Sequence, residues 1–245
     1  MIEKKREIEV ILSIPFWPYR SIKKDAIVVV IDILRASTSM VGALDYGLSR
    51  IRPMALREEA RKLKTTECLL AAEIEGKQWE HADMGNSVDD FRQAHLKDKE
   101  LILSTTNGTR ALHMAAEIAD TVVVGAFANL NAVADYIRQQ DKDVILFCSG
   151  YKNTLALEDQ LFAGALANLL MRTQQYHSLC DALKASIDLW RIAQPNLLEY
   201  IKDISHRRRL PHILSQEALT YTFTPNSSEC VPVFKDPYIQ LAISN

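Results

Sequence analysis

Residues 104–110, Ser-Thr-Thr-Asn-Gly-Thr-Arg, place five small polar side chains, a glycine and an arginine between an apolar strand pattern and an apolar helix pattern. Unpaired backbone N–H groups at a helix start, with hydroxyl groups beside them, form a cradle for phosphate, and Arg110 can add a forked contact. Threonine and asparagine also cap helices when no ligand is present. The pattern alone therefore leaves anion binding and capping equally open for Ser104, Thr105, Thr106, Asn107, Gly108, Thr109 and Arg110.

Asp32 follows the apolar run of residues 26–31, where a carboxylate costs free energy unless a cation or a hydrogen-bond donor receives it. Arg35 is a candidate partner, so one interpretation is a structural Asp–Arg pair or a cap for the helix that follows. The other interpretation is a magnesium ligand or a nucleophile, because both need a carboxylate at the end of a strand that faces a pocket.

Further acidic residues stand in two other places. Glu158 and Asp159 open an alanine-rich helix pattern, where the helix dipole favours negative charge without any catalytic role. Glu73, Asp83 and Asn86 lie in the polar segment 72–87, which has the character of a solvated loop or of an active-site lid. Taken singly, Glu73 and Asp83 favour the solvated loop.

The cysteine and histidine spacings argue against a zinc site. No C-x-x-C pair occurs among the four cysteines, and the histidines form no H-x-x-x-H or H-E-x-x-H pattern, so any metal is expected among oxygen ligands. The cysteines are expected to be reduced. The basic run of residues 206–209 is more often an exposed helix face, although it could turn a cation toward an anionic substrate.

The elements that must position these residues alternate between short β-branched runs and helical patterns, which is typical of parallel strands with helical crossovers. Strands are predicted at residues 9–14, 26–33, 101–104, 121–125, 143–148 and 229–234, with others near Ile51 and Leu69 and a turn at 15–18. Helices are predicted at residues 37–46, 109–119, 130–140, with Asn129 as N-cap, and 158–172, and residues 178–219 are expected to be mostly helical.

Ligands of an open parallel sheet bind beyond the carboxyl ends of its strands. The strands at 26–33, 101–104 and 143–148 each run into polar residues, so these segments are expected to meet at one end of the sheet. Because no internal repeat and no flexible linker divide the 245 residues, we expect a single α/β unit, compatible with two tightly packed halves.

Composition excludes several classes of function. The chain is 48% hydrophobic and 24% charged, which is ordinary for a globular protein, and its formal net charge of −2 argues against nucleic acid as a partner. No apolar run approaches the ~18 residues of a membrane span, and the N-terminus lacks a signal-peptide pattern, so a cytoplasmic protein is expected. Apolar residues in the C-terminal helices are compatible with a homodimer.

Together these segments resemble one family, the 2-phosphosulfolactate phosphatases. The resemblance is carried by VVIDILRAST (29–38), STTNGTRAL (104–112), CSG (148–150) with LEDQLFAGAL (157–166), the residues A-E, G and D-x-G-N-S between 72 and 87, and SHRRRL, TPN and VP near the C-terminus. It extends over nearly the whole chain.

The resemblance implies a three-layer α/β/α fold and magnesium-dependent hydrolysis of a phosphomonoester. Phosphosulfolactate is the named substrate, within a wider class of phosphorylated 2-hydroxycarboxylates. It places the site at Asp32, Arg35, Ser37, Thr38, Glu73, Asp83, Asn86, Ser87, the cradle residues 104–110, Glu158 and Asp159. We expect Mg²⁺ to be held by some of Asp32, Glu73, Asp83, Glu158 and Asp159, since it prefers a few carboxylates and several waters.

The chain departs from the family pattern in three places between residues 74 and 88. Ile74 stands where an arginine is expected, His81 and Ala82 replace Gly-Phe, and Val88 replaces a proline. The missing arginine would have met an anionic group of the substrate, so these departures bear on which substrate is bound.

Three questions stay open on the sequence alone. The nucleophile is either water, with a carboxylate as its base, or Asp32 itself. A protein that binds phosphate or carboxylate without catalysis is the alternative function. A nucleotide-dependent enzyme is less favoured, because neither G-x-G-x-x-G nor G-x-x-x-x-G-K-[ST] occurs.

Overall fold

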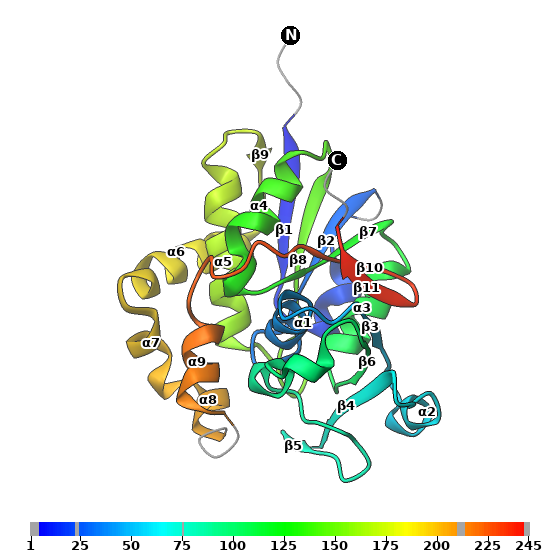
Figure 1. Ribbon diagram of the computed structural model, residues 1–245. Coiled ribbons are helices and arrows are strands. Elements are labelled where there is room, and N and C mark those ends of the chain that lie inside the picture. Colours follow the sequence, from blue (N-terminus) through cyan, green and yellow to red (C-terminus); the bar gives the residue numbers. More distant parts are fainter. Residues whose placement is uncertain (1–4, 23–24, 75, 210–213, 243–245) are drawn as a thin grey trace.

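The computed structural model describes residues 5–22, 25–74, 76–209 and 214–242. Within them, eleven strands form one mainly parallel sheet in the order β5-β4-β6-β3-β11-β10-β7-β2-β8-β1-β9 (Figure 1). The strands are β1 (Arg6–Ile11), β2 (Ala26–Ile31), β3 (Arg50–Pro53), β4 (Cys68–Ile74), β5 (Lys77–Gln78), β6 (Glu100–Ser104), β7 (Thr121–Gly125), β8 (Asp143–Cys148), β9 (Tyr176–His177), β10 (Pro232–Lys235) and β11 (Tyr238–Leu241). The predicted α/β class is confirmed.

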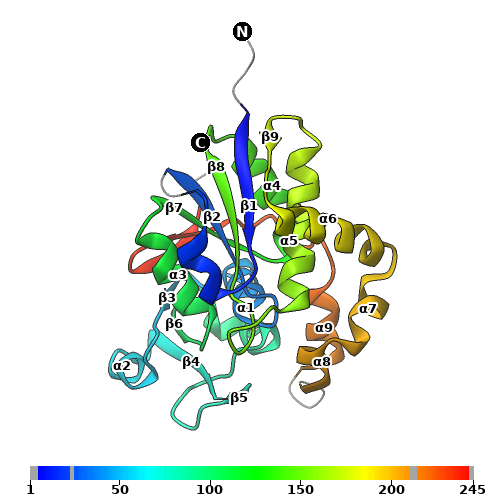
Figure 2. The ribbon, with the colours of Figure 1, turned by 180° about the vertical axis from the view of Figure 1, so that it is seen from behind.

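Helices pack on both faces of the sheet. They are α1 (Ala36–Asp45), α2 (Arg57–Lys62), α3 (Gly108–Ala116), α4 (Leu130–Arg138), α5 (Leu157–Met171), α6 (Asp181–Ala193), α7 (Leu197–Tyr200), α8 (Ser205–Arg209) and α9 (Gln216–Thr222). Helix α4 contacts β7, α5 contacts β8 and α6 contacts β1. Helix α3 contacts β2, and the 3₁₀ helix η1 (Ile14–Tyr19) contacts β1 and β8. Figure 2 shows β1 between β8 and β9, with which it pairs in parallel.

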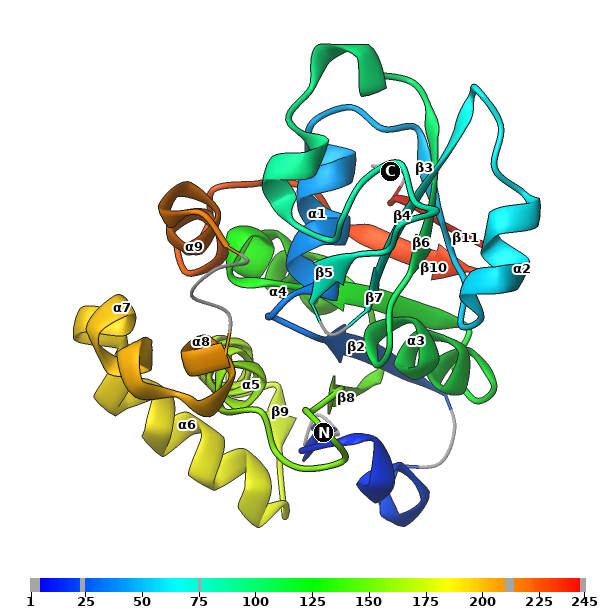
Figure 3. The same cartoon turned by 90° about the horizontal axis from the view of Figure 1, so that it is seen from below.

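The sheet contains two parallel groups of strands joined by an antiparallel hairpin. One group is β7, β2, β8, β1 and β9, the other is β3, β6 and β4, and β10 and β11 lie between them. The pairs β7–β10, β10–β11 and β11–β3 are all antiparallel. The strands of one group therefore run in the opposite direction to the strands of the other. Strand twist accumulates over these pairs, and the group of β3, β4 and β6 runs across the direction of β2 and β7 in Figure 3.

The central strands are buried on both faces, as expected of a sheet covered by helices. Every residue of β2 is buried, and so are all residues of β8 except the first. Phe147 of β8 stacks on Trp17 of η1 with ring centroids 4.2 Å apart, while Phe162 of α5 meets Phe127 edge to face on the other side. These contacts fix β2 and β8, whose ends carry polar loops.

Most predicted elements are confirmed within a few residues, and several details differ, among them α2, β5 and β9, which were not predicted. The first strand is β1, earlier than 9–14, and the turn at 15–18 belongs to η1. The last predicted strand, at 229–234, corresponds to β10, and β11, which was not predicted, follows it. Asn129 is the N-cap residue of α4, as predicted, but its side chain makes no capping hydrogen bond to that helix: it accepts from Ala126 N–H and donates to the carbonyls of Val124 and Cys230.

The C-terminal third is helical, as predicted, through α6 to α9 and short 3₁₀ turns, while residues 210–213 of that stretch lie outside the described residues. All four cysteines are free thiols, in agreement with the sequence. In the part of the chain that the structure describes, no helix has the length and apolar character that crossing a bilayer requires.

Candidate active site

One pocket collects the loops that follow β2, β4, β6 and β8, together with one side chain of α8. The residues lining it are Asp32, Leu34, Arg35, Ala36, Glu73, Gly76, Asn86, Thr105, Thr106, Asn107, Arg110, Gly150, Tyr151, Lys152, Asn153 and His206. The predicted convergence of three strand ends is thus confirmed. Strands β4 and β6 run opposite to β2 along the sheet. Their ends reach the same pocket because the sheet twists through the β10–β11 hairpin.

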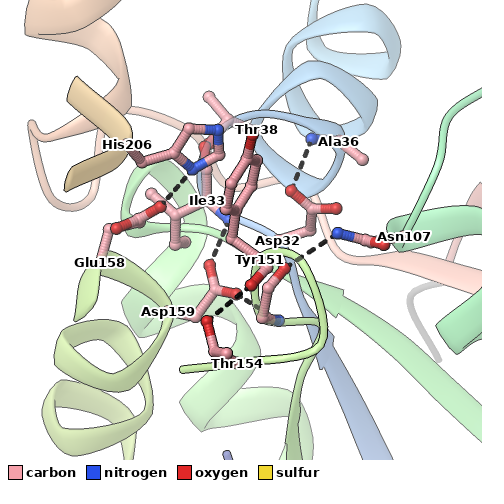
Figure 4. Close-up of polar contacts among 11 residues, drawn as sticks. Asp32, Ile33, Ala36, Thr38, Asn107, Tyr151, Thr154, Glu158, Asp159 and His206 are labelled. Carbon is pink, nitrogen blue, oxygen red and sulfur yellow. Dashed lines mark hydrogen bonds and ion pairs between the residues drawn. The ribbon is translucent and has the colours of Figure 1, made fainter. Parts of the chain in front are cut away.

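Asp32 occupies the turn between β2 and α1. Its Oδ1 accepts a hydrogen bond from Ala36 N–H at 3.2 Å (Figure 4). Its own N–H donates to Ser37 Oγ at 3.0 Å. Burial raises the pKa of Asp32 from 3.8 to about 6, helped by the nearby Glu158 and Glu73 and opposed by His206 and the Ala36 bond. A carboxyl group with this pKa is suited to exchange protons near neutral pH.

Arg35 does not form the predicted pair with Asp32. Its Nη2 donates to the Gly76 carbonyl at 2.7 Å instead, which ties the start of α1 to the loop after β4. Burial lowers the pKa of Arg35, and the carboxylates of Glu73, Asp90 and Asp32 oppose that shift. The guanidinium is therefore a buried cation at the pocket wall.

The segment 104–110 forms the end of β6 and the first turn of α3. Capping accounts for part of it, since Thr109 N–H donates to Thr105 Oγ1 at 3.3 Å and Thr109 Oγ1 donates to the Thr105 carbonyl at 2.7 Å. Asn107 instead donates to the Gly150 carbonyl at 3.0 Å, linking α3 to the loop after β8. Arg110 is exposed at the pocket rim and forms no hydrogen bond or ion pair with any described residue.

Glu158 and Asp159 stand behind the pocket wall rather than in it. Asp159 accepts from Ile33 N–H at 2.8 Å with Oδ1 and from Gly150 N–H at 3.1 Å with Oδ2, so it joins the loops after β2 and β8. Burial, with Glu158 and Asp32 nearby, raises the pKa of Asp159 well above its ordinary value. Glu158 Oε1 lies 2.7 Å from Nδ1 of His206, as Figure 4 shows.

The segment 72–87 contributes two of its predicted residues to the pocket. Glu73 lies on β4 and accepts from Gly76 N–H at 2.6 Å and from Thr106 Oγ1 at 3.3 Å. Asn86 is buried beside it, and its Oδ1 has no hydrogen-bond partner among the described residues. The lid interpretation fits these two better than the solvated loop does.

Asp83 is the predicted metal ligand that the structure places elsewhere. Its Oδ1 lies 2.5 Å from Nζ of Lys64, its Oδ2 accepts from Leu70 N–H at 2.9 Å, and it is not a pocket-lining residue. The polar segment simply turns this carboxylate outward, as the solvated-loop interpretation predicted. We leave Asp83 out of the ligand set.

Several predicted binding residues support the pocket without lining it: Ser37, Thr38, Ser87, Ser104, Gly108 and Thr109. Thr38 Oγ1 donates to the Ile33 carbonyl at 2.9 Å, and Ser87 N–H donates to Asp90 Oδ2 at 2.9 Å, so both hold loop backbone. The Oγ atoms of Ser87 and Ser104 are buried without a partner among the described residues.

Sequence reasoning missed His206 and the loop that carries Tyr151, Lys152 and Asn153. That loop is a tight turn: Tyr151 and Thr154 exchange two backbone hydrogen bonds of 2.9 Å, and Lys152 and Asn153 have φ values of 48° and 62°. Among the described side chains of the basic run, only that of His206 lines the pocket, whereas Arg207 donates to the Leu198 carbonyl and Arg208 is exposed. The SHRRRL segment of the resemblance was the available signal for His206.

Comparison with known proteins agrees with this arrangement. A family profile described as 2-phosphosulpholactate phosphatase matches residues 17–237. The chain belongs to this family. A protein of Caldanaerobacter subterraneus named "Probable 2-phosphosulfolactate phosphatase" is 34% identical over 89% of this chain and 91% of its own length. Relatives of the same name from Clostridium perfringens (31%, covering 96% of each chain) and Pseudothermotoga lettingae (32%, covering 94% and 99%) are equally extensive. The family identifies the chain as a phosphoric monoester hydrolase.

The departures from the pattern of the 2-phosphosulfolactate phosphatase family fall outside the pocket. Ile74 is 42% exposed on β4, and His81 packs edge to face on Trp79. Ala82 and Val88 are buried, and Val88 fills the space beside Gly42 of α1, where a Cβ would meet its Cγ2 at 2.4 Å. None of the four lines the pocket.

The oxygen atoms of the pocket fit a magnesium ion that also binds substrate. Within the described residues no three His, Cys, Asp or Glu side chains form a metal-binding group. Mg²⁺ in phosphoryl-transfer sites is usually held by one or two carboxylates plus substrate phosphates and water. Asp32 and Glu73 supply two carboxylates, and the unpartnered Oδ1 of Asn86 is a further oxygen. Glu158 and Asp159 do not line the pocket and drop out of this set.

Proposed function

We propose that this chain hydrolyses the phosphomonoester of a small anionic 2-hydroxy acid, 2-phosphosulfolactate, with Mg²⁺ as cofactor. The observation that carries the proposal is the contact between Asp32 and the start of α3. A Cβ at Gly108 would lie 2.9 Å from Asp32 Oδ2, so the carboxylate stands directly beside the helix N-terminus that can receive a phosphate. The names of the relatives support the substrate.

The residues of α3 and the surrounding cations would hold the transferring group. The first turn of α3 carries the exposed guanidinium of Arg110, and both Arg110 and the buried Arg35 line the pocket. Positive charge at these positions stabilises the charge that develops on the phosphoryl oxygens. When bound by Asp32 and Glu73, magnesium would neutralise further charge on the phosphate.

Asp32 would accept the proton of the attacking water. Its pKa of about 6 leaves it largely ionised at neutral pH while keeping it basic enough to take a proton. The stereochemical course at a phosphorus atom made chiral with oxygen isotopes separates this role from direct attack by Asp32. A single attack by water inverts the configuration at phosphorus, whereas two displacements through an aspartyl phosphate retain it.

The loop after β8 would meet the second anionic group of the substrate. Lys152 is exposed on the tight turn at the pocket, and its Nζ lies 5.6 Å from the ring centroid of Tyr151. Neither Arg110 nor Arg35 belongs to this loop. The sulfonate or carboxylate of the substrate would therefore bind Lys152, while the two arginines bind the phosphate. This arrangement favours a dianionic ester over a simple alkyl phosphate.

Release of inorganic phosphate from 2-phosphosulfolactate, with magnesium and with excess EDTA, tests the proposal directly. We expect turnover with magnesium and its loss in EDTA, restored by added Mg²⁺. Equal turnover in EDTA would reject the metal. Tight binding of phosphate with no turnover of any phosphorylated 2-hydroxy acid would favour the non-catalytic binding protein.

A further inference from the structure

Glu158 holds His206 in the pocket, although the two residues are 48 positions apart in the sequence. Nδ1 of His206 lies 2.7 Å from Glu158 Oε1, and the side chains are 14% and 2% exposed. Glu158 is on α5 behind the pocket wall, whereas His206 is on α8 and lines the pocket. The pair therefore connects a buried carboxylate to the reaction space through the imidazole ring (Figure 4).

The geometry fixes which ring nitrogen is available to a substrate. A carboxylate beside Nδ1 holds a proton on that nitrogen and orients the ring. Nε2 is then the nitrogen left to face the pocket. The ring of Tyr151 packs against the imidazole with centroids 4.6 Å apart, which restricts its rotation further. This is an oriented histidine in a site where Asp32 is the other proton-exchanging group.

The leaving group of the proposed substrate creates a need for such a residue. A 2-hydroxy acid leaves phosphate as an alkoxide, a strong base that requires a proton as the P–O bond breaks. Arginine side chains are not deprotonated in proteins, so the two guanidinium groups of the pocket are not proton donors to a leaving group. Lys152 is exposed on the turn, and Asp32 is occupied at the other end of the reaction as acceptor of the water proton.

We propose that His206 is the general acid that protonates the leaving oxygen and that Glu158 is its positioning residue. The assignment rests on the proposed phosphatase function. As the ester P–O bond breaks, its electron pair goes to the alkoxide oxygen, which takes the Nε2 proton from the imidazolium form of His206, while Nδ1 keeps its proton against Glu158. Water forms the new P–O bond and gives its proton to Asp32. Transfer of that proton back to His206 through solvent restores both residues.

A substrate that differs in one atom tests the assignment. In the phosphorothiolate analogue of phosphosulfolactate, sulfur replaces the bridging oxygen, and a thiolate leaves without needing a proton. For His206→Gln we expect kcat on the oxygen ester to fall by ~100-fold or more, the scale of general acid catalysis. On the sulfur ester the same variant should stay within about threefold of the unmodified protein.

Two further variants separate positioning from structure. Glu158→Gln should lower kcat on the oxygen ester by a smaller factor, with the same preference for sulfur, because the ring stays but loses its oriented proton. His113→Gln is the matched control. Like His206, His113 is partly buried and has a hydrogen-bond partner for one ring nitrogen, the Pro53 carbonyl at 3.3 Å, but it does not line the pocket. It should change neither ester.

Each outcome decides the assignment. An equal loss on both esters in His206→Gln, or an unchanged oxygen-ester kcat, would overturn the role of His206 and leave the phosphatase function standing. Absence of turnover of either ester by the unmodified protein would reject both. If His206→Gln does not fold, NMR of ¹⁵N-histidine in the unmodified protein replaces it. Added inorganic phosphate should then shift a histidine Nε2 resonance whose Nδ1 is protonated, and no such shift would overturn the proposal.

Discussion

Gly108 and Asp32 are so close that any side chain at position 108 would force its neighbours to shift. A Cβ there would lie 2.9 Å from Asp32 Oδ2 and 2.6 Å from the Cβ of Ala36. Because Asp32 and Ala36 are held by a hydrogen bond of 3.2 Å, neither can withdraw freely. The glycine thus allows the first turn of α3 to approach the carboxylate, which is the relationship on which the proposed chemistry depends.

The first prediction concerns Gly108→Ala. The added methyl group must push α3 away from Asp32, and overpacking of this kind costs about 1–3 kcal/mol of unfolding free energy. We expect a matching shift in urea unfolding and a loss of phosphate affinity measured by calorimetry. A variant with unchanged stability and unchanged phosphate binding would show that α3 does not contact the anion through this turn.

The second prediction is that Asp32→Asn inactivates the protein and stabilises it. We expect kcat to fall by ~100-fold or more. The folded pKa is about 6 against an ordinary 3.8, so ionisation of Asp32 opposes folding above pH 6, and this cost disappears as the pH falls below about 4. In EDTA at pH 8 the variant should therefore gain up to about 3 kcal/mol, from roughly two units at 1.36 kcal/mol each.

Urea unfolding at pH 8 and at pH 4 measures that difference. The stabilisation should be present at pH 8 and absent at pH 4. Asp83→Asn is the control, because Asp83 pairs with Lys64 outside the pocket. It should keep kcat within about threefold. Destabilisation of Asp32→Asn at pH 8 would instead make Asp32 a structural cap.

Local patterns predicted much of this molecule because strands and helices are encoded by short-range periodicity. The loops after β2, β6 and β8 were identified as site-forming from polar residues at the ends of apolar strands. Capping within 104–110 is confirmed in part, since Thr105 and Thr109 bond to each other, whereas anion binding by this segment stays a prediction.

Long-range contacts account for what the sequence did not reveal. Strand β11 has four residues and pairs with β10 and β3, and no periodicity can be recognised over so short a run. His206 reaches Glu158 across 48 positions, and neither residue's neighbours indicate the contact. The outward direction of Asp83 likewise depends on Lys64 and Leu70, which lie on separate elements.

The third prediction concerns Arg110→Ala. A hydrogen bond to a charged group contributes roughly 1.5–3 kcal/mol, so phosphate or vanadate binding should weaken by roughly ten- to a hundredfold. Thermal stability should hardly change, because Arg110 is exposed and has no partner among the described residues. Arg61→Ala, on the exposed face of α2, removes the same charge away from the pocket and should leave binding unchanged. Equal weakening in both variants would indicate a general charge effect rather than a contact.

The last prediction concerns Ile74→Arg, at the position where the family pattern has an arginine. Ile74 follows Glu73 on β4, so its side chain points to the opposite face of the strand, and it pairs with Lys77 of β5. An arginine there would meet a like charge rather than the substrate. We expect kcat/KM for 2-phosphosulfolactate to change by less than about threefold, as in the control Ile192→Arg on the exposed side of α6. A gain of tenfold or more, limited to substrates with a second anionic group, would contradict this geometry. It would show that the segment 72–87 moves on binding and carries residue 74 to the substrate.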